Sequence, residues 1–250
     1  MTDAPAHSRA DWHGRRRGRR LRPRRQDLLT ELLPRLRVTL PPAGGALDLA
    51  GLFPQPPSAL WLEVGFGSGE HLAEQAHRHP DIGFIGCEVF VNGVAALVGQ
   101  VERLELANVR IFDDDAHLLL TALPEASIDR AFLLFPDPWP KTRHAKRRFV
   151  GPANLATMAY ILADGAEFRV ATDDVGHVRW TLQHLIGHPD FRWGATGPRD
   201  WRNPPPDWVE TRYQRKAVAA GRQPVFLCFQ RQPRLGKSRK SLRFAGRDLY

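Results

Sequence analysis

The sequence predicts an α/β protein: a doubly wound, mostly parallel sheet of seven strands with helices on both faces. From residue 59 onward, short apolar runs alternate with longer segments of helical periodicity, as in consecutive β-α-β units. A glycine-rich turn, residues 65–69, directly follows the first run, where a doubly wound sheet binds its ligand. Acidic residues stand at the ends of later runs. We therefore expect the functional site at the carboxyl edge of the sheet.

Each predicted strand is a short apolar run bounded by turn residues. The strands are expected at residues 59–64, 83–89, 109–112, 128–135, 167–172, 191–194 and 225–230, the last of them as an antiparallel insertion near the edge. Helical periodicity predicts helices near residues 69–78, 91–106, 116–122, 152–163 and 174–187. Pro152 suits a first helical turn, where its missing N–H is not needed, and Asp164-Gly165 supplies the turn into the next strand. The proline-rich segment 198–208 is expected to form a long ordered loop.

The basic charge of the chain is concentrated at its two ends. The formal net charge is +9 and the pI about 10.3, but residues 1–25 contribute +7 and residues 231–250 contribute +6, which leaves −4 for residues 26–230. We expect a flexible basic extension over 1–25, a catalytic domain over 26–230 and a basic tail over 231–250. Solvated tails with no specific role are the alternative. Leucines at helical spacing predict a short amphipathic helix that docks on the domain: Leu28, Leu29, Leu32, Leu33 and Leu36.

Composition excludes several classes of protein. The two cysteines, Cys87 and Cys228, provide neither a disulfide framework nor metal-ligand spacing, so we expect no metal. No run of eighteen uncharged apolar residues is present, and the first apolar patch, residues 28–33, is too short and too charged for an export signal. A cytoplasmic protein is expected.

The predicted cofactor loop favours a cationic ligand. Its G-x-G-x-G spacing differs from the G-x-G-x-x-G of dinucleotide folds, and Glu63 just before it is a poor neighbour for a pyrophosphate. A carboxylate suits S-adenosylmethionine, whose amino group and sulfonium are both positive. Glu88, 23 residues after Gly65, is placed to accept hydrogen bonds from ribose hydroxyls, a position shared with NAD enzymes. Asp115 is expected beside the adenine, unless residues 113–115 form only a solvated loop.

A second loop combines a fixed carboxylate with a dense basic run. Two prolines bracket Asp137 after the fourth predicted strand and restrict the loop before substrate arrives. Trp139 offers a stacking face, and five of the eight residues 141–148 are cationic and suited to phosphates. An ordinary proline-rich surface loop is the alternative.

These motifs resemble the bacterial tRNA (guanine-N7)-methyltransferases over about residues 15–230. The resemblance rests on residues 63–69, on residues 135–141, on Ala171-Thr172-Asp173 and on Thr211-Arg212-Tyr213. It implies a class I fold dependent on S-adenosylmethionine, a monomer or homodimer, and methylation of guanine 46 in the variable loop of tRNA. By position it implies cofactor contacts at Glu63, Gly65, Gly67, Glu88, Asp115, Ala116 and Asp137, the last also catalytic. It implies substrate contacts at Lys141, Asp173, Thr211, Arg212, Tyr213 and Gln214, and RNA contacts at Arg143, His144, Ala145, Lys146, Arg147 and Arg148. Gln214 departs from the glutamate that is common in the family, so it keeps an acceptor but lacks a charge.

Three other functions remain open at this stage. A nicotinamide-dependent oxidoreductase shares the sheet and Glu88, but the glycine spacing disfavours it. Methylation of an exocyclic base amine often uses Asn or Asp followed by Pro-Pro-aromatic, whereas this chain has Asp137-Pro138-Trp139-Pro140. A non-catalytic RNA-binding protein would rely on the basic ends alone.

Overall fold

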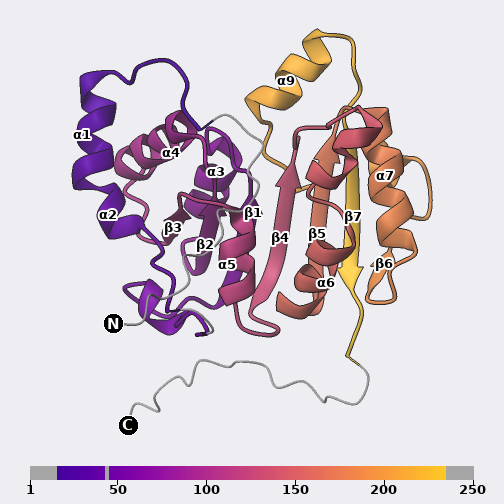
Figure 1. Ribbon diagram of the computed structural model, residues 1–250, viewed down its shortest axis with the longest axis horizontal. Helices are drawn as coiled ribbons and strands as arrows, with labels where there is room; N and C mark the ends of the chain where they lie inside the picture. The colour runs from indigo at the N-terminus through magenta and orange to yellow at the C-terminus, as the bar shows by residue number, and fades with distance from the viewer. Residues whose placement is uncertain (1–15, 43–44, 235–250) are drawn as a thin grey trace.

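A seven-stranded sheet forms the centre of the computed structural model, which describes residues 16–42 and 45–234. The strand order is β3-β2-β1-β4-β5-β7-β6, and β7 runs antiparallel to both of its neighbours while the other pairs are parallel. The predicted fold class is therefore confirmed (Figure 1). The strands are β1 (Ala59–Val64), β2 (Ile82–Cys87), β3 (Val109–Phe112), β4 (Ile128–Leu134), β5 (Leu162–Thr172), β6 (Phe191–Trp193) and β7 (Val225–Arg231).

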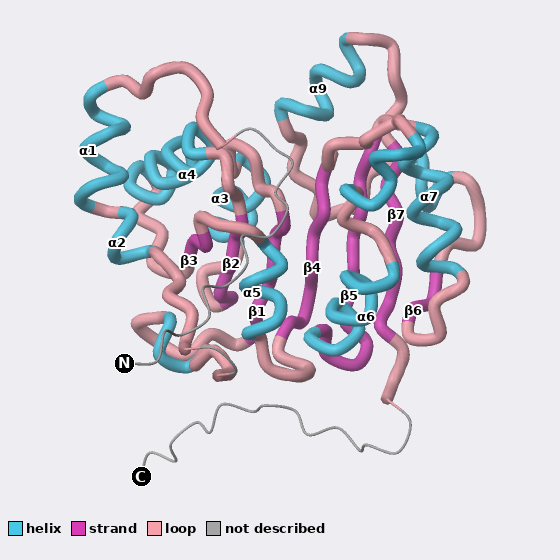
Figure 2. The backbone as a smooth tube through the Cα atoms, viewed as in Figure 1, coloured by secondary structure: helices cyan, strands magenta, loops and turns pink. Residues whose placement is uncertain are grey.

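Helices cover both faces of the sheet and bury two apolar clusters. In β1, Leu62 belongs to one cluster and its neighbour Trp61 to the other, as expected when successive side chains point to opposite faces. Fully burying a side chain such as Leu62 stabilises the fold by about 1.5–3 kcal/mol. Figure 2 shows α5 and α6 in front of the sheet. The helices of the first cluster are α5 (Ala116–Ala122), α6 (Pro152–Ile161) and α7 (Val175–Ile186). Those of the second include α3 (Glu70–Arg78) and α4 (Val91–Arg103).

The predicted amphipathic helix is present as two short helices. They are α1 (Pro23–Glu31), which packs against α4, and α2 (Leu33–Leu36). Leu28, Leu33 and Leu36 are buried. The break at Leu32 precedes Pro34, whose ring and missing N–H do not fit a helix interior.

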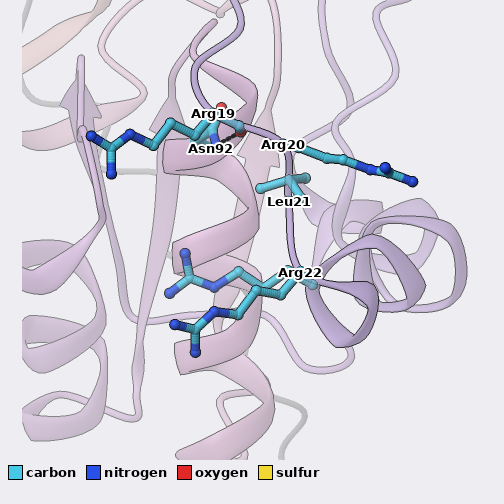
Figure 3. Close-up of a pocket in the computed structure, with 6 residues that line it drawn as sticks. Arg19, Arg20, Leu21, Arg22 and Asn92 are labelled. Carbon is cyan, nitrogen blue, oxygen red and sulfur yellow. Dashed lines mark hydrogen bonds between the residues drawn. The ribbon is translucent and has the colours of Figure 1, made fainter.

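Residues 16–22 lie against the start of α4, although the sequence assigns them to the flexible extension. The amide of Val91 donates to the carbonyl of Arg16 (2.9 Å), and the amide of Gly18 donates to Asn92 Oδ1 (2.8 Å). Arg19, Arg20, Arg22 and Asn92 line a hollow here, and Figure 3 shows the Arg20 side chain pointing away from Asn92. Residues 1–15 and 235–250, the outer parts of the two predicted basic ends, lie outside the described residues, so the division into three segments stays a prediction.

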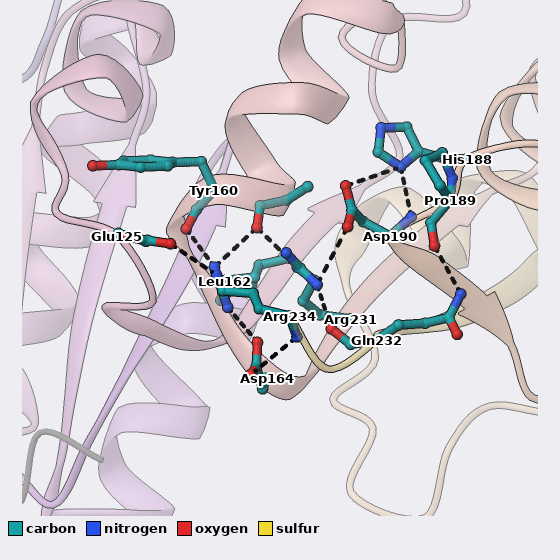
Figure 4. Close-up of polar contacts among 11 residues, drawn as sticks. Glu125, Tyr160, Leu162, Asp164, His188, Pro189, Asp190, Arg231, Gln232 and Arg234 are labelled. Atoms are coloured by element: carbon teal, nitrogen blue, oxygen red, sulfur yellow. Dashed lines mark hydrogen bonds and ion pairs between the residues drawn. The ribbon is translucent and has the colours of Figure 1, made fainter. Parts of the chain in front are cut away.

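The predicted turn before β5 is instead an irregularity inside that strand. Ile128 pairs with Leu162 and Arg130 with Glu167, so β5 carries extra residues in between, where Gly165 adopts a positive φ of 84°. The Arg234 side chain holds this bulge, because it donates to the carbonyl of Leu162 (2.9 Å) and pairs with Asp164 (Figure 4). Arg234 is only 12% exposed, so the segment predicted as a basic tail from 231 begins as part of the packed domain.

Two short helices were not expected from the sequence. Helix α8 (Arg199–Arg202) is a single turn inside the predicted loop, and α9 (Arg212–Ala219) precedes β7. Helix α9 is amphipathic but spans only eight residues, and Ala217 is its one buried residue, so the segment is too short for apolar periodicity to indicate a helix. A 3-10 helix, η1 (Ala50–Leu52), precedes β1. None of the helices among residues 16–42 and 45–234 is long and apolar enough to cross a bilayer.

Candidate functional site

The candidate site lies at the carboxyl edge of the parallel strands, where the loops after β1, β2, β3, β4 and β5 meet. Figure 1 shows α9 above this edge of the sheet. Parallel strands bring their carboxyl ends together, so residues far apart in the sequence converge here. The predicted cofactor and substrate residues therefore share one edge, as the sequence analysis requires.

The glycine loop is pressed between α4 and α9. Gly65, Gly67 and Gly69 all have positive φ (70°, 58° and 75°), a conformation that glycine adopts at no steric cost. A Cβ on Gly67 would lie 2.9 Å from Cε2 of Tyr213, and one on Gly93 would lie 2.1 Å from the carbonyl oxygen of Gly67. Glycine is thus required at both positions for these elements to approach.

Glu88 is held by backbone amides at the end of β2. Its Oε2 accepts from Gly67 N (2.8 Å), and its Oε1 accepts from Val89 N and Phe90 N (2.9 Å each). Burial raises the pKa of Glu88, the three amides lower it, and the negative charge of Asp137 raises it, with a net rise. None of the described cationic side chains forms an ion pair with Glu88. Glu88 and Asp137 therefore repel each other, and a cationic ligand would relieve that repulsion.

Glu63 points into the protein beneath the glycine loop. It is 4% exposed, and its Oε2 lies 2.7 Å from Nδ1 of His71 on α3. Gln75, one turn further along α3, donates to the carbonyl of Asp207 (2.8 Å), which ties the helix to the segment before α9. The partnership of Glu63 with His71 was not expected. It braces β1 against α3 directly below the loop.

The three aspartates after β3, residues 113–115, have two different roles. Asp113 accepts two hydrogen bonds from Arg37 (2.8 Å each), and Asp114 pairs with Arg16. Asp115 instead caps α5, because its Oδ1 accepts from His117 N (3.0 Å), and none of the described cations pairs with it. Ala116 is the first residue of α5. The structure thus assigns two of these aspartates to contacts with the N-terminal segment and leaves Asp115 at the site.

The loop after β4 holds Asp137 at the surface in a strained backbone. Phe135 and Trp139 have positive φ (50° and 43°), which costs roughly 1–3 kcal/mol per residue for side chains other than glycine. Asp137 is exposed, and none of the described residues forms an ion pair with it. The 3-10 helix η2 (Thr142–Arg147) follows, and Arg147 stacks on the Trp139 ring at 5.0 Å from its centroid. One face of the predicted stacking residue is therefore already covered.

The predicted substrate residues after β5 and at the start of α9 are mostly engaged with other side chains. Asp173 accepts from Arg222 (2.6 Å), and Arg212 donates to Glu70 at the start of α3 (2.7 Å). Thr211 caps α9, and Gln214 Oε1 accepts from the indole N–H of Trp208 (2.6 Å). Lys141 is exposed beside Asp137 in the sequence.

Tyr213 joins the glycine loop to the rest of α9. Its ring lies over Gly67 and is 41% exposed. Burial raises the pKa of its hydroxyl, and the charge of Glu88 raises it further. Tyr213 thus lies between the predicted cofactor residues and the other predicted substrate residues. Its contact with Gly67 was not expected from the sequence.

A charged network that the sequence analysis missed fixes the segment before α9. Asp207 accepts from Arg130 (2.8 Å) and Arg169 (2.7 Å), and Glu167 bridges the same two arginines. Burial acts to raise the pKa of Asp207, but the hydrogen bond from Arg169 and the two positive charges lower it below its usual value. The strands β4 and β5 thereby hold the chain that leads into α9. No local sequence signal connects a loop aspartate with arginines on two strands.

Comparison with known proteins supplies a family. The sequence pattern of a family described as "Putative methyltransferase" matches residues 57–227. A tRNA (guanine-N(7)-)-methyltransferase of Rhodospirillum rubrum is 54% identical over 229 residues, covering 90% of this chain and 89% of the relative. A protein of the same name from a Chelativorans species is 50% identical over 228 residues, covering 91% of this chain and 97% of the relative. The solved structure of TrmN from Thermus thermophilus is similar at a TM-score of 0.51 with 16% identity, covering 83% of this chain and 48% of that chain, which supports the fold.

Proposed function

This chain belongs to the family of tRNA (guanine-N(7)-)-methyltransferases, and we propose that it methylates N7 of guanine 46 in the variable loop of tRNA with S-adenosylmethionine as donor. The proposal rests on this family membership together with the carboxylates that line the edge of the sheet beside the glycine loop. We further propose a cytoplasmic protein that acts as a monomer or homodimer.

The residues present fit the proposed donor. Glu88, Asp115 and Asp137 lie around the glycine loop, and no described cation pairs with any of them. A donor with a sulfonium and an ammonium group supplies the missing positive charge. Glu88 and Asp115 would accept from the ribose hydroxyls and the adenine amine, and the backbone of Gly65, Gly67 and Ala116 would line the pocket. Glu63, which pairs with His71, would support the glycine loop from beneath by holding β1 against α3.

The proposed reaction does not require a general base. N7 of guanine carries an in-plane lone pair, which forms the new N–C bond while the S–C bond breaks and its electron pair stays on sulfur. S-adenosylmethionine, when bound, supplies the electrophilic methyl carbon. The chain must hold the reacting atoms in line at roughly 3–3.5 Å. Asp137 is our candidate catalytic residue, because a fixed carboxylate stabilises the positive charge that develops on the guanine.

Substrate contacts are proposed on both sides of Asp137. Lys141 and the exposed cations of residues 143–148 would contact RNA phosphates, and Asp173 would hold the edge of the guanine. Thr211, Arg212, Tyr213 and Gln214 would contact the same nucleotide from α9. Gln214 offers an uncharged acceptor where the family commonly has glutamate.

The experiment that tests the proposal uses unmodified tRNA and isotopically labelled donor. After incubation with the full chain, the modified nucleotide is located by nuclease mapping and mass spectrometry. We expect 7-methylguanosine at position 46. A methylated exocyclic amine would contradict the reaction, another labelled position would contradict the site, and no transfer to tRNA would favour a protein that only binds RNA.

A further inference from the structure

The basic stretch after Asp137 contains two kinds of cation. Arg143 and Lys146 are exposed, as expected of residues that contact phosphates. Arg148 is partly buried and turns its guanidinium toward the chain. The resemblance treats all of them alike, but the structure separates Arg148 from the exposed pair.

Arg148 binds two consecutive carbonyls of the Asp137 loop. Its Nε donates to the carbonyl of Pro138 and its Nη2 to that of Trp139, each at 3.0 Å. This arrangement uses the planar fork of a guanidinium, which offers two donors in fixed geometry. A lysine ammonium carries the same charge but lacks that fork.

The other side of the guanidinium rests on α7. Arg148 Cζ lies 4.7 Å from the ring centroid of Trp180, whose indole N–H donates to the carbonyl of Val150 (2.5 Å). Nearby His177 is fully buried, and burial followed by the Arg148 charge lowers its pKa to about 4, so at neutral pH it adds no competing cation. Trp180 therefore serves as a platform that orients Arg148 toward the loop.

The loop needs such a support. Phe135 and Trp139 hold left-handed backbone on either side of Asp137, and conformations of this kind persist only where the surroundings enforce them. No described side chain pairs with Asp137 itself. The two hydrogen bonds from Arg148 fall on the two residues directly after Asp137, so they fix the 138–139 and 139–140 peptide units around the strained Trp139.

We propose that Arg148 is a positioning residue that holds the Asp137 loop in its active geometry through Pro138 and Trp139 and is supported by Trp180, and that it is not an RNA phosphate contact. The inference rests on the proposed role of Asp137 in methyl transfer.

The decisive variant is Arg148→Lys, compared with the matched double variant Arg143→Ala/Lys146→Ala. We expect Arg148→Lys to lower kcat at least about tenfold. The tRNA dissociation constant should stay within about twofold of wild type, and the salt slope, which is the dependence of tRNA affinity on salt concentration, should not change. The double variant should raise KM for tRNA, reduce the salt slope by about two and change kcat little. If Arg148→Lys kept full kcat while Arg148→Ala lost tRNA affinity and salt slope, Arg148 would be a phosphate contact.

A second measurement is independent of catalysis. Hydrogen–deuterium exchange of wild type and Arg148→Lys is compared at the amides of Asp137 and Trp139. Faster exchange confined to residues 135–149 is expected, whereas unchanged exchange there would overturn the proposal even if the chain methylated nothing. Trp180→Phe should produce a smaller change of the same kind. A wild-type chain that transfers no methyl group would instead contradict the proposed function and leave the exchange result to decide the role of Arg148.

Discussion

The two halves of the candidate site differ in how their polar groups are satisfied. Around the glycine loop, Glu88 and Asp115 accept hydrogen bonds from backbone amides and have no cationic partner among the described residues. On the opposite side, Asp173 and Gln214 are already bound to Arg222 and Trp208. Under the proposed roles, the donor half is preformed for a cation, and we expect the substrate half to exchange internal contacts when RNA binds. Mutations in the two halves should therefore affect different steps.

The largest effect is expected where the halves meet. Asp137→Ala should lower kcat by more than tenfold, equivalent to about 1.4 kcal/mol or more, because it removes the carboxylate proposed to stabilise the charged product. Asp137 is exposed, so the melting temperature should change little. Single-turnover kinetics and thermal unfolding measure both quantities. A variant that retains more than a tenth of the wild-type rate would contradict the catalytic role.

In the donor half, Glu88→Gln should weaken donor binding about tenfold while leaving the affinity for tRNA intact. The wild type should also bind donor less tightly at low pH. A cationic donor prefers the ionised carboxylate, and the pKa of Glu88 is raised, so protonation competes with binding at a higher pH than for an ordinary glutamate. Calorimetry should show affinity falling as the pH drops through this range and proton release on binding. Glu88→Gln should flatten both trends. A pH dependence that persists in this variant would assign it to another group.

In the substrate half, two substitutions of Gln214 test its hydrogen bonding and its lack of charge separately. Gln214→Leu leaves the Trp208 indole N–H without its acceptor, at a cost of about 1–3 kcal/mol, and should raise KM for tRNA about fivefold with unchanged donor affinity. Gln214→Glu keeps the acceptor and should stay within about threefold of wild type. Steady-state kinetics with tRNA as the varied substrate tests this. A large defect in Gln214→Glu would show that the neutral charge matters here.

Asp207, which fixes the segment before α9 through Arg130 and Arg169, should make the stability of the folded chain sensitive to acid. The folded-state pKa of Asp207 is lowered, so its stabilising contribution is present above the unfolded pKa and is lost as the pH falls through the folded value. Asp207→Asn should lower the melting temperature by about 2–4 °C at neutral pH, and the difference from wild type should shrink in acid. Equal differences at neutral and acidic pH would mean that packing, and not charge, explains the loss.

The smallest effect is expected from the segments beyond the described residues. Residues 1–15 carry no net formal charge, and residues 235–250 carry +4, from five Lys or Arg against Asp248. Deleting both segments should lower kcat/KM several-fold at low salt and little at high salt, because we expect their charges mainly to accelerate encounter. This deletion preserves the docked arginines of residues 16–25 and Arg234. Salt-independent loss would make these ends specific RNA-binding elements.

The sequence was sufficient wherever a signal is local. The bounds of β1 and β3 and the glycine loop agree with prediction because short apolar runs, glycine spacing and strand-end acids are encoded within a few residues. Helix α9 was not predicted, because its amphipathic pattern is confined to eight residues with one buried alanine, which is shorter than the segment over which helical periodicity is recognised.

Residues that act through distant partners also lay beyond local reasoning. His71, Arg222 and Arg148 each bind a group brought near by the fold, and for Arg148 the acceptors are backbone carbonyls, which carry no sequence identity. Residue type alone therefore gave the same interpretation to all the cations of residues 143–148.

The placement of β7 also has a consequence for how the chain folds during synthesis. Among the described strands, β6 pairs only with β7, and β7 lies between β5 and β6. A nascent chain that ends before residue 225 therefore presents two open strand edges, which are templates for pairing with other chains. This half of the sheet closes only after residue 231 has left the ribosome. Arg231 and Arg234 then fasten the new strand to the end of α6 by donating to the carbonyl of Ala159.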